Sequence, residues 1–149
     1  MDQSTLTNHE QCPHCSRFDN RGVTVNGVII RDGKILLIRR GVEPWKGMWA
    51  LPGGFVEWDE TTEDAVRREL KEEIALDVQK VKLIGAFSDP ARHPKQVINL
   101  SYLIEAYTGE PQHGDDAAEV KWFALDELPE TMACDHKSII EFALSSWSK

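Results

Sequence analysis

The chain has 149 residues, of which 41% are hydrophobic and 28% are charged, as is typical of a single globular domain. Its 17 basic and 25 acidic residues give a formal net charge of −8, which disfavours binding to nucleic acid or to anionic membranes. No apolar run approaches a membrane span and no N-terminal signal pattern is found, so we expect a cytoplasmic protein.

The first 21 residues are polar and show neither helical nor strand periodicity, so we expect an N-terminal arm before a domain at 22–149. Within the arm, Cys12 and Cys15 have the spacing of half a zinc knuckle, but a second Cys-x-x-Cys pair is absent. Further candidate ligands are His9, His14, Cys134 and His136. Four ligands would have to come from scattered positions, so we expect a vestigial motif without bound Zn²⁺, and cytosolic thiols.

The domain begins with residues that favour strands. The β-branched stretch 23–30 and the aliphatic stretch 35–40 flank an Asp-Gly pair, which predicts a hairpin. A short strand is expected near Trp49 and should end at Gly53 and Gly54, where the backbone needs the freedom of glycine.

A helix is predicted next. Thr61 or Thr62 can cap its first turn. Apolar residues recur at every fourth position as a buried stripe, formed by Val66, Leu70 and Ile74.

Three further strands and a final helix complete the expected fold. The strands are predicted at 81–87, 97–107 and 120–123, and the helix at 133–147. This order of elements indicates an α/β protein, with a mixed sheet and helices packed on it.

Carboxylates crowd the first predicted helix. Glu69, Glu72 and Glu73 stand at positions i, i+3 and i+4 and therefore share one helix face, where they repel one another. Hard oxygen ligands at this density suit Mg²⁺ or Mn²⁺. Arg68 can fork onto Glu60 or Glu69 and hold the chosen carboxylate in one orientation.

The same segment resembles the Nudix box, a pattern of glycine, glutamate and arginine at fixed offsets. The matching residues are Gly54, Glu60, Arg68, Glu69, Leu70, Glu72, Glu73 and Leu76. Six charged and glycine positions agree by chance with odds on the order of one in a hundred thousand. Ala75 departs from the pattern, which has glycine there, and a left-handed alanine would cost about 1–2 kcal/mol.

The resemblance implies an α/β/α sandwich and a site for a divalent metal. It implies that Glu69, Glu72 and Glu73 ligate the metal, with the carbonyl of Gly53 as a further ligand, and that Arg68 orients the carboxylates. The implied chemistry is attack of water on a phosphorus of a substrate pyrophosphate. Glu69 is the favoured general base, and alternatives in a later loop stay open, namely Asp115, Asp116 and Glu119.

The segment 88–94 is similar to a loop of ADP-ribose pyrophosphatases, with Pro90 as its marker residue. Arg40 is a candidate for holding a substrate phosphate, and Trp45 for stacking on a base. ADP-ribose, cleaved to AMP and ribose 5-phosphate, is therefore the favoured small-molecule nucleotide substrate. The alternatives are sanitation of oxidised nucleoside triphosphates and non-catalytic nucleotide sensing. The resemblance also gives a weak expectation of a homodimer.

Overall fold

The computed structural model describes residues 20–114 and 117–147. The proposed zinc-knuckle residues of the arm and two base candidates lie outside the described residues; these are His9, Cys12, His14, Cys15, Asp115 and Asp116. Within the described part of the chain, no helix is both long and apolar enough to cross a membrane.

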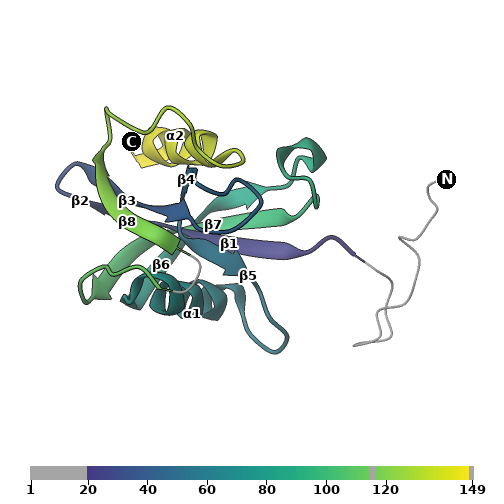
Figure 1. Cartoon of the computed structure of the whole chain (residues 1–149). Helices are drawn as coiled ribbons and strands as arrows, with labels where there is room; N and C mark the ends of the chain where they lie inside the picture. The colour runs from purple at the N-terminus through teal and green to yellow at the C-terminus, as the bar shows by residue number, and fades with distance from the viewer. Residues whose placement is uncertain (1–19, 115–116, 148–149) are drawn as a thin grey trace.

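Two four-stranded sheets lie between two helices (Figure 1). The first sheet is mixed, with strand order β5-β1-β7-β6; its strands are β1 Val23–Val28, β5 Gly53–Phe55, β6 Asp77–Phe87 and β7 Ile98–Thr108. The second sheet is antiparallel around β3; its strands are β2 Ile30–Arg31, β3 Lys34–Arg40, β4 Trp49–Ala50 and β8 Ala117–Ala124. The helices are α1 Thr62–Ile74 and α2 His136–Trp147. The predicted α/β/α sandwich is confirmed, with its strands divided between two sheets.

The alternation of β3 explains why helices cover both sides. All four residues from Ile35 to Ile38 are at most 2% exposed. Leu36 and Ile38 belong to the apolar cluster that includes the α1 stripe, whereas Ile35 and Leu37 belong to the cluster that includes α2. Because successive strand residues point to opposite faces, an uninterrupted apolar run requires a packed layer on each side.

The predicted hairpin forms only at its tip. Asp32 and Gly33 have φ values of 54° and 74°, as a two-residue hairpin turn requires, and β2 pairs with β3 across this turn. The longer β1, however, pairs in parallel with β7 and antiparallel with β5 in the other sheet. β1 therefore carries the chain from one sheet into the other, and the expectation that all of 23–30 pairs with 35–40 is wrong.

Helix α1 is capped at both ends. The side chain of Thr61 accepts a hydrogen bond from the backbone N–H of Asp64, so Thr61 is the N-cap. Ala75 ends the helix in the left-handed conformation, with φ 64°. The connection between β7 and β8 also packs on this end, because Gly114 N donates to the carbonyl of Glu73 at 2.7 Å. The helix is thus fixed at both termini as well as through its buried stripe.

Candidate active site

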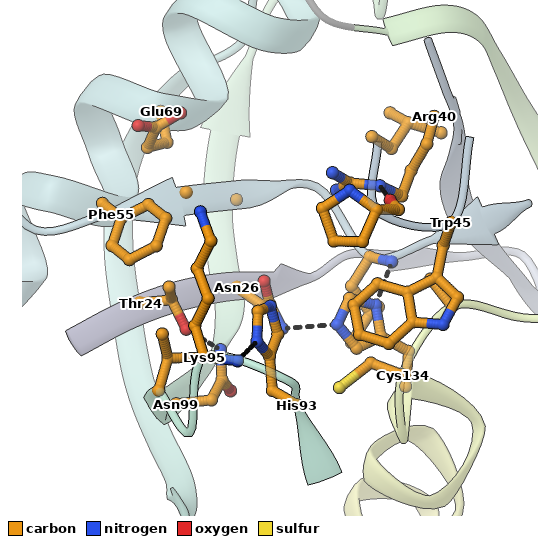
Figure 2. Close-up of a pocket in the computed structure, with 18 of the residues that line it drawn as sticks. Thr24, Asn26, Arg40, Trp45, Phe55, Glu69, His93, Lys95, Asn99 and Cys134 are labelled. Atoms are coloured by element: carbon orange, nitrogen blue, oxygen red, sulfur yellow. Dashed lines mark hydrogen bonds between the residues drawn. The ribbon is translucent and has the colours of Figure 1, made fainter. Parts of the chain in front are cut away.

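A cavity of about 380 Å³ opens where β1, β3, β5 and β7 meet the loops before β4, before β7 and before α2 (Figure 2). One end of its lining is acidic and includes Glu57, Glu69 and Glu73. The rest is aromatic, basic and polar, and includes Arg40, Trp45, His93 and Lys95. The cavity therefore joins the predicted catalytic helix to segments far from it in the sequence.

Arg68 forms the centre of the acidic end. Its Nε and Nη2 atoms donate to the two carboxylate oxygens of Glu60 at 3.0 and 2.8 Å. Its Nη1 atom donates to Glu69 at 3.0 Å and to Glu72 at 3.2 Å, and Nη2 also donates to the carbonyl of Phe55 at 2.9 Å. One guanidinium thus hydrogen-bonds three carboxylates, including both of the partners considered in the sequence analysis, Glu60 and Glu69.

Burial and charge act in opposite directions on these carboxylates. The hydrogen bonds from Arg68 lower the pKa of Glu60 below its usual range. Burial raises the pKa of Glu69 despite its contact with Arg68, and the nearby carboxylates of Glu72 and Glu57 raise it further. The acidic end therefore holds more negative charge than Arg68 compensates.

Glycine lets the carboxylates approach the start of β5. A Cβ atom on Gly54 would collide with the carboxylate of Glu69, and one on Gly53 would collide with the carbonyl of Val25. Gly53 N donates to Glu73 at 2.9 Å. Gly54 therefore makes room for Glu69, whereas Gly53 makes room for β1. Neither has a positive φ, so the need for glycine here is steric.

The donor set fits a hard divalent cation, since the carboxylates of Glu69 and Glu73 and the backbone of Gly53 line the same cavity. Glu72 does not line it; its half-exposed carboxylate contacts Arg68. Among residues 20–114 and 117–147, no three His, Cys, Asp or Glu side chains already converge as a complete metal-binding group. Glu60, Glu69 and Glu72 instead contact the Arg68 guanidinium.

Arg40 and Trp45 lie at the end of the cavity away from Glu69 (Figure 2). Arg40 Nε donates to the carbonyl of Pro44 at 2.6 Å, and Trp45 packs edge to face on His93 with ring centroids 5.1 Å apart. Burial, followed by the charges of nearby arginine and lysine side chains, lowers the pKa of His93 and so favours the neutral ring. A neutral aromatic pair beside a cation suits a base linked to phosphate.

Pro90 does not line the cavity. It begins the 3₁₀ turn η2, Pro90–Arg92, and so shapes the loop whose later residues, Arg92, His93 and Lys95, do line it. Arg92 is 4% exposed in its side chain and makes a two-pronged ion pair with Asp135, at 2.9 and 2.7 Å. This pair ties the loop to the segment before α2.

The remaining candidates have other partners. Glu119 pairs with Arg39 at 3.1 Å and does not line the cavity. The thiol of Cys134 donates to the carbonyl of Arg92, and burial raises its pKa to about 11. His136 accepts from the backbone N–H of Leu51 at 3.0 Å, and its other ring nitrogen lies 3.3 Å from the Asn26 amide. Cys134 and His136 are therefore engaged within the fold.

Several cavity residues were not identified from the sequence. They are Thr24, Asn26, Phe55, Arg92, His93, Lys95 and Asn99, which come from four separate segments of the chain. The strand pattern gave a usable signal for two of them, because Asn26 and Asn99 are polar residues within otherwise buried strands.

A family model described as the NUDIX domain matches residues 20–142. The chain therefore belongs to the NUDIX family, and the resemblance found in its acidic helix is confirmed. It is 50% identical over 121 residues to a protein of Methanocaldococcus jannaschii named ADP-ribose pyrophosphatase, an alignment that covers 80% of this chain and 70% of the relative.

Two solved structures with bound ligands share the fold. The NUDIX domain of NrtR from Shewanella oneidensis, in complex with ADP ribose, has a TM-score of 0.76 and 26% identity, covering 91% of this chain and 92% of that one. A bifunctional NMN adenylyltransferase/ADP ribose pyrophosphatase from Francisella tularensis, in complex with AMP and a manganese ion, has a TM-score of 0.71 and 31% identity. That alignment covers 85% of this chain and 42% of the other.

Proposed function

We propose that this protein hydrolyses the pyrophosphate of ADP-ribose to AMP and ribose 5-phosphate, with Mg²⁺ or Mn²⁺ as cofactor. The observation that carries the proposal is one cavity with Glu69 and Glu73 at its acidic end and Arg40, Trp45 and His93 farther along. The name of the relative from Methanocaldococcus jannaschii supports ADP-ribose as the substrate, and the ligands of both solved structures are consistent with it.

Each residue then has a distinct task. Glu69, Glu72 and Glu73, with the carbonyl of Gly53, are the proposed metal ligands, and Arg68 keeps the carboxylates oriented. The bound cation would polarise phosphoryl oxygens and lower the pKa of a water molecule.

Hydrolysis needs one proton acceptor. A water oxygen bonds to phosphorus as the bridging P–O bond breaks, and the proton of the water passes to a carboxylate, for which we propose Glu69. Attack on the adenosine-linked phosphorus expels ribose 5-phosphate, and attack on the other phosphorus expels AMP, so the two products are the same in both cases.

A substrate panel tests this proposal. Purified protein with Mg²⁺ or Mn²⁺ is incubated with ADP-ribose, NAD and 8-oxo-dGTP, and products are separated and identified. We expect the highest kcat/KM on ADP-ribose. Preference for 8-oxo-dGTP would support nucleotide sanitation instead, and binding of ADP-ribose without any turnover would support a sensing role.

A further inference from the structure

A chain of buried hydrogen bonds runs behind the wall of the cavity formed by β1 and β7. The hydroxyl of Ser101 donates to Oδ1 of Asn99 at 2.6 Å, and Nδ2 of Asn99 donates to the hydroxyl oxygen of Thr24 at 3.0 Å. Ser101 and Asn99 are 0% and 1% exposed. An amide oxygen only accepts and an amide nitrogen only donates, so the direction of the chain is fixed.

This direction determines which hydrogen-bonding groups of β1 and β7 are available to a ligand in the cavity. The Thr24 oxygen already accepts a hydrogen bond, so its own proton is left to donate. The Asn99 amide nitrogen carries a second proton, for which the described residues provide no further hydrogen bond. Thr24 and Asn99 face each other in the parallel pair of β1 and β7, and both line the cavity. Two neighbouring donors therefore face the same space.

Lys95 adds a positive charge to this wall. Its side chain runs from the loop before β7, past Thr24 and Asn99, toward β5 (Figure 2). Within residues 20–114 and 117–147 no carboxylate pairs with its ammonium group. Its backbone is held, since Lys95 N donates to His93 Nδ1 at 3.0 Å and the next carbonyl, of Gln96, accepts from Arg21 at 2.6 Å.

We propose that Thr24, Asn99 and Lys95 form a subsite for the non-nucleoside half of the substrate, the ribose 5-phosphate. The inference rests on the proposed function. Ribose 5-phosphate carries hydroxyl and phosphate oxygens and no aromatic ring, which matches two fixed donors and a cation. The aromatic side chain of Trp45 lies on a different side of the cavity (Figure 2), where the nucleoside half is placed.

Each product of the reaction probes one half of the site: AMP probes the nucleoside half, and ribose 5-phosphate probes the proposed subsite. Inhibition constants of AMP and of ribose 5-phosphate are measured against ADP-ribose hydrolysis, and binding of each product is measured independently by calorimetry. Thr24→Val removes the hydroxyl and keeps the shape, and Lys95→Met removes the charge. We expect each variant to weaken ribose 5-phosphate binding about tenfold and to change AMP binding less than about twofold.

Two controls complete the experiment. Thr24→Ser restores the hydroxyl and should bind ribose 5-phosphate like the wild type. Lys82→Met removes an exposed lysine from β6, away from the cavity, and should bind both products normally. Melting temperatures check folding; Lys95 is exposed, so its variant remains informative if Thr24→Val is unstable.

The outcomes distinguish the subsite from the activity. Unchanged ribose 5-phosphate binding in both variants, equal weakening of both products, or no ribose 5-phosphate binding by the wild type would overturn the subsite. ADP-ribose cleavage together with any of these results leaves the proposed function intact. Conversely, the wild type could bind ribose 5-phosphate in a way that depends on Lys95 and yet not cleave ADP-ribose. This result would support the subsite and contradict the proposed hydrolysis.

Discussion

At the scale of single residues, Arg68 organises the acidic end of the site through the shape of its guanidinium. Two of its nitrogens donate hydrogen bonds to Glu60, and the third donates to Glu69 and Glu72. A lysine has one ammonium group and cannot reproduce this fork. We therefore expect Arg68→Lys to lower kcat on ADP-ribose by about 10- to 100-fold and to raise the Mg²⁺ concentration needed for half-maximal rate.

The neighbouring Arg67 provides a matched control. It pairs with Asp64 on the exposed side of α1, one turn away along the helix, at 3.2 Å. Arg67→Lys changes the same functional group in the same helix, yet it should leave kcat and the Mg²⁺ dependence close to those of the wild type. Wild-type kinetics in Arg68→Lys would show that the fork has no orienting role.

At the scale of elements, the C-terminus of α1 places a side chain in a left-handed backbone conformation that favours glycine. Ala75 has φ 64°, a conformation that costs a residue with a Cβ about 1–2 kcal/mol. Glycine removes this strain but gains about 0.4–1 kcal/mol of entropy in the unfolded chain. The strain is larger, so Ala75→Gly should raise the free energy of unfolding by about 1 kcal/mol.

The same exchange inside the helix should act in the opposite direction. Ala65 is fully buried in the first turns of α1, where glycine is costly, so Ala65→Gly should lower the free energy of unfolding by about 1 kcal/mol. Both changes are measured by urea denaturation of the two variants. Destabilisation by Ala75→Gly would mean that the left-handed residue is not strained.

Helix α1 was predictable because its signals all lie within one stretch of sequence. The cap at Thr61, the buried stripe and the spacing of the three glutamates depend only on helical periodicity. β1 was not predicted correctly, because its pairing with β7 joins residues about 75 positions apart. An Asp-Gly turn indicates that a hairpin forms, but it does not indicate how far the two strands stay paired.

At the scale of the whole molecule, His136 joins α2 to both sheets. Its Nδ1 accepts from Leu51 N, which a protonated ring cannot do, and burial lowers its pKa from 6.5 to about 4. Between pH 6.5 and about 4, His136 is protonated in the unfolded chain but stays neutral in the folded protein. Stability should therefore fall as the pH falls through this window, by about 3 kcal/mol in total.

Urea denaturation at several pH values between 7 and 4 measures this loss. His136→Gln removes the titrating ring, so its free energy of unfolding should depend less steeply on pH over the same range. An equally steep decline in His136→Gln would assign the pH dependence to other groups.

Only part of the candidate cavity could be predicted from the sequence. Glu69, Glu73 and Arg68 are grouped by one helix, whereas Thr24, His93, Lys95 and Asn99 meet only when β1, β7 and their loops assemble. Pro90 was singled out from the sequence, but it does not line the cavity; the lining side chains of its loop come after it. Tertiary contacts between distant segments, which periodicity does not encode, decide this part of the site.

The activity proposed for this protein is metal-dependent cleavage of ADP-ribose by the carboxylates of α1. Its most direct test measures AMP release from ADP-ribose by the wild type, Glu73→Gln and Glu63→Gln, each with Mg²⁺ and with excess chelator. Glu63 lies on the same helix and does not line the cavity. We expect equal amounts of AMP and ribose 5-phosphate from the wild type and Glu63→Gln with Mg²⁺, and at least about a hundredfold slower release from Glu73→Gln or with chelator. Full activity in Glu73→Gln, or release that is unaffected by chelator, would contradict the account.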